Sequence, residues 1–232
     1  MKNHNIFITF EGGEGAGKSS VLKKVIEELN NRNIPVVKTR EPGGNKLEFQ
    51  KDIRNMIMSY DNLDTITELL LFEADRREHI TKVIKPALAE GKMVISDRFS
   101  DSTTVYQGFV KGLPRGVVEA ANNIVTADSI PNLTFIFDID PEVAQTRIGN
   151  GDRNRNRFDN ESIAFHTKVR DAFLKLAEED NKRYKVIDAS KSLEEVVKQV
   201  EDIIYNDEII NESIINKNEK TIKIQESINE TN

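Results

Sequence analysis

Cysteine and tryptophan are absent from the 232 residues, and no apolar run approaches the roughly 20 residues that a membrane-spanning helix needs. Without cysteine the chain forms neither disulfides nor thiolate metal sites, which fits a reducing compartment. Basic residues are also few, because 33 lysines and arginines stand against 39 aspartates and glutamates. A general nucleic-acid binder would have a basic surplus. These deficits favour a cytoplasmic protein without a membrane or nucleic-acid partner.

The run from Gly12 to Ser19, GGEGAGKS, matches every position of the phosphate-binding pattern G-x-x-x-x-G-K-[ST]. An apolar segment that reads as a strand precedes it, and apolar residues at helical spacing follow it. The alternative is a glycine-rich turn with a chance lysine, which would not require a strand before it and a helix after it. We expect backbone N–H groups and the helix N-terminus to bind phosphates. Lys18 would reach the β- and γ-phosphates, and the Ser19 hydroxyl would bind Mg²⁺. The predicted ATP site comprises Gly12, Gly13, Glu14, Gly15, Ala16, Gly17, Lys18, Ser19 and Ser20.

Short apolar segments alternate with helical patterns along the chain. The five predicted strands cover residues 6–10, 35–39, 93–96, 133–137 and 184–187. Six helices are predicted. The first begins after residue 19, the second covers about 47–58, and the third runs from a Thr65–Glu68 capping box to Gly91. The fourth starts at Asp140–Pro141, the fifth covers about 161–182, and the sixth begins at a capping box at Ser192–Glu195. This order predicts an α/β fold with a central five-stranded parallel sheet and helices on both faces. Ligands bind such sheets beyond the carboxyl ends of the strands.

Asp97 and Arg98 end the third predicted strand at that ligand-binding edge. An aspartate there can hold Mg²⁺ through its water shell, and an arginine can bind a phosphate with two hydrogen bonds. An ordinary ion pair at a strand end is the alternative. The polar run Ser100–Gly108 follows directly, and its hydroxyl, amide and phenol groups suit recognition of a nucleoside.

Five sequence blocks together resemble the bacterial thymidylate kinases, over about residues 6–205. They are EGGEGAGKS at 11–19, TREPGG at 39–44, LFEADRREH at 71–79, DRF at 97–99 and YQG at 106–108. The resemblance implies a P-loop kinase fold and ATP- and Mg²⁺-dependent phosphorylation of dTMP to dTDP, by direct in-line transfer, in dTTP biosynthesis. It also implies a homodimer packed through helices. Kinases of other nucleoside monophosphates or of free deoxynucleosides, and a nucleotide-dependent switch, remain as alternatives.

The resemblance also implies roles for residues that would recognise the nucleoside. Phe72 matches the aromatic ring that stacks on thymine, and Arg76 matches the arginine that binds its exocyclic oxygen. Thr103 lies where the family reads the thymine edge, with Gln107 close by, and Tyr106 matches the ring that packs against the sugar. From the residues alone, Phe72 could be a core residue, Arg76 part of a solvated helix face, and Tyr106 a packed aromatic.

Around the phosphates, Glu14 matches the acid near the substrate's 3′-hydroxyl, and Arg98 and Arg54 match residues that hold the acceptor phosphate. The predicted substrate set comprises Glu14, Glu41, Arg54, Phe72, Arg76, Arg98, Ser102, Thr103, Tyr106 and Gln107, and the predicted metal set comprises Ser19 and Asp97. Lys18, Arg98, Arg153 and Arg157 form the predicted catalytic set.

An arginine-rich stretch at about 149–160 lies where the family has its mobile lid. Some family members carry an arginine in the phosphate loop, where this chain has Gly15, so the resemblance assigns the cation over the transferred group to Arg153 and Arg157 of the lid. The kinase domain is expected over residues 1–206. Residues 207–232 form a polar tail, predicted to be disordered or a frayed helix, with an ordered extension of the last helix as the alternative.

Overall fold

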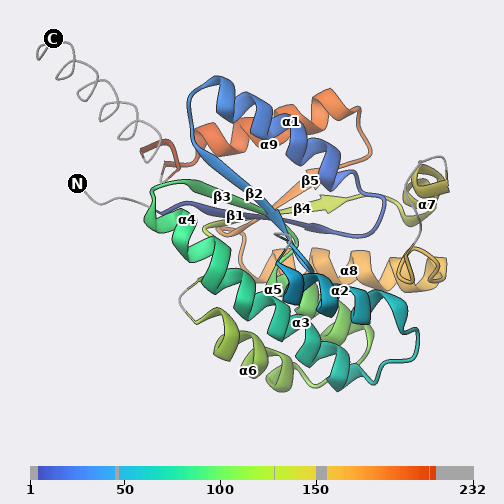
Figure 1. Cartoon of the computed structure of the whole chain (residues 1–232). Coiled ribbons are helices and arrows are strands. Elements are labelled where there is room, and N and C mark those ends of the chain that lie inside the picture. Colours follow the sequence, from blue (N-terminus) through green and yellow to red (C-terminus); the bar gives the residue numbers. More distant parts are fainter. Residues whose placement is uncertain (1–4, 45–46, 128, 150–155, 209, 213–232) are drawn as a thin grey trace, which may run out of the picture.

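Five parallel strands form the central sheet of the computed structural model, which describes residues 5–44, 47–127, 129–149, 156–208 and 210–212 (Figure 1). The strands are β1 Phe7–Gly12, β2 Val36–Arg40, β3 Met93–Asp97, β4 Leu133–Asp138 and β5 Tyr184–Asp188. Their order in the sheet is β2-β3-β1-β4-β5. The predicted five-stranded parallel sheet is therefore confirmed, and each strand lies within one or two residues of its predicted position.

Helices cover both faces of this sheet, as predicted. In Figure 1, α1 and α9 lie side by side over one face, and α3, α6 and α8 lie on the other. The helical elements are α1 Lys18–Asn31, α2 Glu48–Ser59, α3 Thr65–His79, η1 Ile80–Ile84, α4 Lys85–Ala89, α5 Ser100–Thr103, η2 Thr104–Val110, α6 Arg115–Thr126, α7 Pro141–Gly149, α8 Ile163–Glu179 and α9 Leu193–Asn206.

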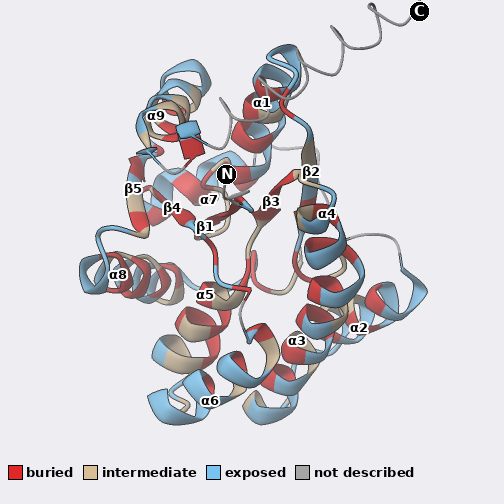
Figure 2. Cartoon of the chain, turned by 90° about the vertical axis from the view of Figure 1, so that its left-hand side faces the viewer, coloured by how far each residue is buried: buried red, intermediate tan, exposed pale blue. Residues whose placement is uncertain are grey.

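The core lies between the sheet and these two helical layers (Figure 2). Alternate residues of β1 point to opposite faces: Ile8 and Phe10 pack in the cluster under α1 and α9, whereas Phe7 packs against η1 and α4. Polar residues of β1 are buried as well. The Thr9 and Thr134 hydroxyls share a hydrogen bond of 2.8 Å, and Glu11 accepts from the Phe99 N–H at 2.7 Å. The carboxylate at the end of this buried strand thus binds the loop that follows β3.

The long helix predicted from Thr65 differs from the structure in two ways. Its N-cap is Asp64, whose carboxylate accepts from the N–H groups of Ile66 and Thr67, so the predicted Thr65–Glu68 capping box is wrong. Glu68 is fully buried and binds other groups. The helix also widens into the π-helical η1 before α4, where Pro86 lacks the N–H that an α-helix would use. Gly91, at a positive φ of 74°, follows its end as expected.

The helical segments between β3 and β4 were not predicted from the sequence. Ser100–Gly108 forms α5 and most of η2, and α6 follows. Serine, threonine, valine and glycine have low helix propensity, so the local pattern gave no helical signal there. The π-helical η2 carries both Tyr106 and Gln107. Single π-helical turns occur often at functional sites.

Two of the predicted helix starts are confirmed by their capping hydrogen bonds. The Ser192–Glu195 capping box is present at α9, and Asp140 accepts from the Glu142 N–H at the start of α7. Ile210, at the start of the predicted tail, is buried in the core beside α1 and α9. The tail beyond residue 212 lies outside the described residues, and the tail prediction stays open. Over the described part of the chain, no helix has the length and apolarity to cross a membrane.

Candidate active site

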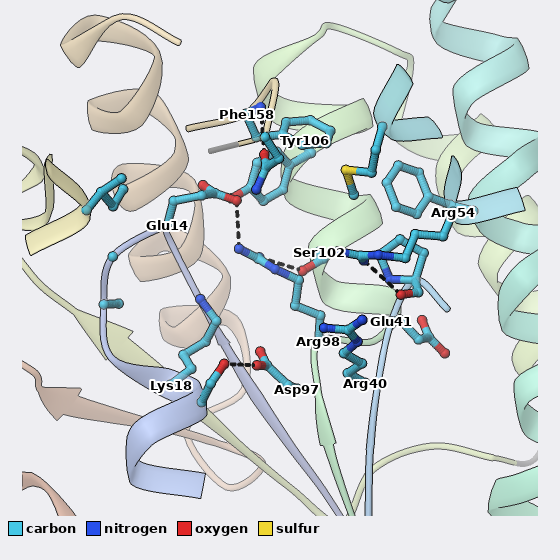
Figure 3. A pocket seen from close by; sticks show the side chains of 18 of the residues that line it. Glu14, Lys18, Arg40, Glu41, Arg54, Asp97, Arg98, Ser102, Tyr106 and Phe158 are labelled. Atoms are coloured by element: carbon cyan, nitrogen blue, oxygen red, sulfur yellow. Dashed lines mark hydrogen bonds and ion pairs between the residues drawn. The ribbon is translucent and has the colours of Figure 1, made fainter. Parts of the chain in front are cut away.

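A cavity of about 500 Å³ lies at the carboxyl ends of β1, β2 and β3 (Figure 3). It joins the phosphate loop to the helical segments that follow β2 and β3. Its lining consists of Glu14, Gly15, Ala16, Gly17, Lys18, Ser19, Ser20, Arg40, Glu41, Pro42, Arg54, Met58, Phe72, Asp97, Arg98, Ser102, Thr103, Tyr106, Gln107, Arg147, Ile148, Asn156 and Phe158. Most of the predicted ATP and substrate residues are therefore brought together in one continuous space.

Lys18 is the first residue of α1 and lies almost buried at the floor of the loop. Its ammonium donates to the carbonyl oxygens of Gly12 and Gly13, at 2.9 and 2.7 Å. Burial, with Arg98 nearby, lowers the pKa of Lys18 to about 8, although Asp97 and Glu14 favour its charged form. The negative charge of bound phosphates would favour the charged form of this buried ammonium.

Gly15 has no room for a side chain. Its φ is +74°, and a Cβ there would lie 2.5 Å from the carbonyl oxygen of Ala144 on α7. An arginine at this position would be strained in its backbone and would collide with α7. The expectation that the loop supplies no arginine of its own therefore has a structural reason.

Ser19 and Asp97 form the predicted metal pair, with the Ser19 hydroxyl donating to the Asp97 carboxylate at 2.7 Å. Among the described residues, no group of three or more acidic or histidine side chains could hold a metal alone. Mg²⁺ in nucleotide sites uses one or two protein oxygens and completes its octahedron with water and phosphate oxygens. A hydroxyl and a carboxylate in contact beside the phosphate loop fit that requirement.

Arg98 links the two halves of the cavity. It donates to Glu14 at 2.8 Å and to Ser102 at 3.1 Å, and its guanidinium lies 5.3 Å from the centre of the Tyr106 ring (Figure 3). Its backbone has a φ of +72°, a conformation that costs a non-glycine residue about 1–2 kcal/mol. Non-glycine residues keep such conformations mainly where the surrounding structure imposes them, often at functional sites.

Glu14 is the shared partner of this cluster. Tyr106 donates to its second oxygen at 2.7 Å, and His166 of α8 lies 3.8 Å from that oxygen. Burial raises the pKa of Glu14, but Arg98, Lys18 and the Tyr106 hydrogen bond outweigh it, so the pKa lies below its ordinary value. Burial also raises the pKa of Tyr106, which therefore stays protonated. An ionised carboxylate thus holds Arg98 and Tyr106 in fixed positions.

The other half of the cavity contains the predicted nucleoside residues. Phe72, Thr103 and Gln107 line it, and Phe72 is only partly buried. Arg54 of α2 lines it too and donates to the Pro42 carbonyl at 3.0 Å. Ser102 donates to Glu11 at 2.6 Å, and this bond fixes the start of α5. This half of the cavity thus offers an aromatic ring together with hydroxyl, amide and guanidinium groups.

Arg76 is buried and is not part of a solvated helix face. It is 1% exposed and donates to Glu41 at 2.9 Å, to Glu73 at 2.5 Å and to Thr103 at 2.9 Å. Burial opposes its charge, but Glu41 and Glu73 raise the pKa of Arg76 above its ordinary value. Glu41 also binds His79 at 2.8 Å. Arg76 does not itself line the cavity among the described residues, and it reaches that space through Thr103.

Only one of the two arginines predicted for the lid is among the described residues. Arg153 lies outside the described residues. Arg157 is described, and its guanidinium forms an ion pair with the buried Glu68 and lies 4.3 Å from the Phe158 ring centre. Like Arg76, Arg157 is absent from the lining of the cavity within the described ranges. Its predicted place over the transferred group stays a prediction.

Several cavity residues were missed by sequence reasoning. Arg147 of α7 lines the cavity beside the phosphate loop and donates to the carbonyl oxygens of Ala189 and Ser190, at 2.9 and 3.4 Å. Met58, Asn156 and Phe158 line it as well. A lone arginine or methionine on an ordinary helix carries no recognisable pattern. Arg40 and Pro42 could have been found, because they belong to the TREPGG block that was already singled out.

Comparisons with known proteins agree with this geometry. The family model described as thymidylate kinase matches residues 10–200. The chain belongs to the thymidylate kinase family. The thymidylate kinase of Ligilactobacillus salivarius is 45% identical over 204 residues, which are 86% of this chain and 97% of that protein. That of Bacillus velezensis is 42% identical over 202 residues, with 86% and 94% covered.

A solved structure supports the same fold. The crystal structure of thymidylate kinase from Ehrlichia chaffeensis superposes with a TM-score of 0.67 at 35% sequence identity, and the alignment covers 85% of this chain and 97% of that one. The family assignment and the P-loop kinase fold predicted from the five blocks are therefore confirmed. Both kinds of relative align over nearly their full length.

Proposed function

We propose that this protein transfers the γ-phosphate of ATP to dTMP and forms dTDP, the step that precedes dTTP in nucleotide biosynthesis. The observation that carries the proposal is the continuity of the cavity: a complete phosphate loop opens directly into a pocket that contains Phe72, Thr103 and Gln107. Arg98 stands between the two halves. A nucleotide in each half would place its terminal phosphate near this arginine.

The donor half is the phosphate loop with Lys18. Loop N–H groups and the N-terminus of α1 bind the ATP phosphates, and Lys18 exchanges its two carbonyl contacts for phosphate oxygens. Ser19 and Asp97 hold the Mg²⁺ that accompanies ATP, which neutralises phosphate charge when bound. The loop Asp188–Ser190 is proposed to contact adenine, and the carbonyl oxygens of Ala189 and Ser190 in this loop accept from Arg147 of the cavity lining.

The acceptor half recognises dTMP. Phe72 stacks on thymine, Thr103 and Gln107 read the edge of the base, and Arg76 contributes through its hydrogen bond to Thr103. Tyr106 lies against the sugar and disfavours a 2′-hydroxyl, while Glu14 lies near the 3′-hydroxyl. Arg98 and Arg54 hold the acceptor phosphate. Glu41 fixes Arg76, and Ser102 fixes Arg98.

No protein nucleophile is needed, because the acceptor phosphate already carries an anionic oxygen. Catalysis therefore consists of alignment and charge stabilisation. Lys18 and Arg98 supply two cations near the reacting groups, and Arg153 of the predicted lid supplies a further one. Exclusion of water by the lid would protect ATP from hydrolysis. Arg157 is assigned to the same lid by resemblance.

The proposal includes a homodimer and a cytoplasmic location. Several large apolar side chains are exposed on helices of the α2, α3 and α6 layer, which supports packing against a second copy. They are Phe49, Met56, Ile66, Leu70, Val117 and Ile124. Lack of cysteine and of a membrane-spanning helix among the described elements supports the location.

A panel of acceptors tests the proposed reaction. With ATP and Mg²⁺, we expect dTMP to give a higher kcat/KM than deoxyuridine, deoxycytidine, deoxyadenosine or uridine monophosphate in a coupled assay of ADP formation. A better rate with another monophosphate would refute the substrate assignment. ATP binding without any acceptor-dependent turnover would favour a nucleotide-dependent switch instead.

A further inference from the structure

Gln107 lines the cavity with one end of its amide already occupied. Its side chain is 1% exposed, and its Nε2 donates to the Oε1 atom of Glu68 at 2.6 Å. Among the described residues, none donates to the Gln107 Oε1. The amide therefore offers the cavity an acceptor, and this holds only while Glu68 keeps the NH₂ end turned away from it.

Glu68 is a fully buried carboxylate near the start of α3 that belongs to no part of the proposed transfer chemistry. The ammonium of Lys111 donates to both of its oxygens, at 2.8 and 2.9 Å, and Arg157 donates to Oε2. Burial opposes ionisation of Glu68, but the hydrogen bonds from Lys111, Arg157 and Gln107 outweigh it and lower its pKa. An ionised carboxylate only accepts hydrogen bonds, so it fixes which end of the Gln107 amide faces it.

Thr103 supplies the complementary group one helical turn earlier. Its hydroxyl oxygen accepts from Arg76 at 2.9 Å, and none of the described residues accepts the hydroxyl proton. The two side chains therefore present a donor and an acceptor to a base. Thymine has an N3–H next to two carbonyl oxygens and can satisfy both. Its 4-amino counterpart, 5-methylcytosine, has a bare N3 that would face an acceptor.

We propose that Glu68 is a positioning residue for base selection: it locks the Gln107 amide so that the cavity accepts a hydrogen bond from the N3–H of a pyrimidine. This inference rests on the proposed function, which places the base beside Gln107. Lys111 and Arg157 keep the carboxylate charged. Selection between thymine and a 4-amino pyrimidine then depends on a residue that does not touch the nucleotide.

Glu68→Gln is the sharpest variant, because it keeps the size of the side chain. Lys111 and Arg157 would bind the new amide oxygen, which leaves its NH₂ to face Gln107. Gln107 then turns over and presents its own NH₂ to the base. We expect the preference for binding dTMP over 5-methyl-dCMP, measured as a ratio of dissociation constants by calorimetry, to fall about tenfold, the scale of one hydrogen bond.

Two further variants separate positioning from a merely structural effect. Lys111→Met removes one ion pair but leaves Arg157 to keep Glu68 charged and Gln107 bound to Glu68, so the ratio should stay unchanged. The double variant Glu68→Gln/Gln107→Glu places the carboxylate at position 107, where it can only accept, and should restore the preference for dTMP. This double variant also tests the idea if Glu68→Gln alone fails to fold.

The outcomes are distinct from those of the proposed reaction. An unchanged ratio in Glu68→Gln, or a double variant that fails to regain the preference, overturns the role of Glu68. Equal binding of dTMP and 5-methyl-dCMP by the unaltered protein overturns it too. The proposed function fails by a different readout, which is the absence of ADP formation when dTMP and ATP are both bound.

Discussion

Replacing Lys18 by alanine is expected to lower kcat by at least about 10²–10³-fold while the fold stays intact. Removal of one preorganised cation or donor from a phosphoryl-transfer site has effects of this size or larger. The fold should tolerate the change because the Lys18 ammonium contacts only two carbonyl oxygens, and its burial disfavours its charge. Steady-state kinetics of the variant measure the loss of kcat, and thermal unfolding of the same preparation tests whether the fold is intact.

Lys23→Ala is the matched control, because Lys23 is an exposed lysine on the same helix. Its turnover should equal that of the unaltered protein. The pH profile gives a second reading: with a pKa of about 8, free Lys18 is charged below that pH and loses its proton above it. The kcat/KM for ATP should therefore fall above about pH 8, whereas bound phosphates extend the kcat plateau to higher pH. Normal turnover by Lys18→Ala would exclude the phosphate-loop assignment.

Arg98→Met is expected to lower kcat/KM for dTMP by about 10³-fold, with the larger part in kcat. The variant removes the cation between the two halves of the cavity. It also leaves Glu14, whose side chain is only 9% exposed, without its charged hydrogen-bond partner. Arg98→Lys should recover only part of the loss, because an ammonium lacks the planar fork that spans Glu14 and Ser102.

Arg115→Met serves as its control. Arg115 also binds two carboxylates, Glu119 and Glu179, but it is exposed on α6 and away from the cavity. Exposed ion pairs contribute little, so this variant should keep full activity. If Arg98→Met retained activity within tenfold of the unaltered protein, the acceptor phosphate would have to be held elsewhere.

Sequence patterns predicted the parts of the fold that depend on local spacing. The strands, the phosphate loop and the Ser192 capping box follow from apolar periodicity and from fixed residue types. The segment after β3 was not predicted as helical, because its polar and β-branched residues have weak helix propensity. Its helices depend on tertiary contacts, including the bond of the Phe99 N–H to Glu11 across 88 residues.

The candidate site divides in the same way. The five blocks predicted which segments would meet, and Phe72, Arg98 and Tyr106 from three of them do line one cavity. The surroundings of Arg76 and Glu68 could not be predicted, because most of their partners, such as Glu41 and Gln107, come from segments distant in sequence. Glu68 illustrates the difficulty: its position suggested part of a helix cap, whereas its carboxylate binds Gln107, Lys111 and Arg157.

The central claim is that two nucleotides meet end to end in this cavity. A crystal structure with dTMP, Mg²⁺ and a non-hydrolysable ATP analogue tests it most directly. We expect thymine against Phe72 with its edge at Thr103 and Gln107, the triphosphate on the loop around Lys18, and the two terminal phosphates on either side of Arg98. A base bound away from Phe72, or phosphates directed apart, would contradict the account.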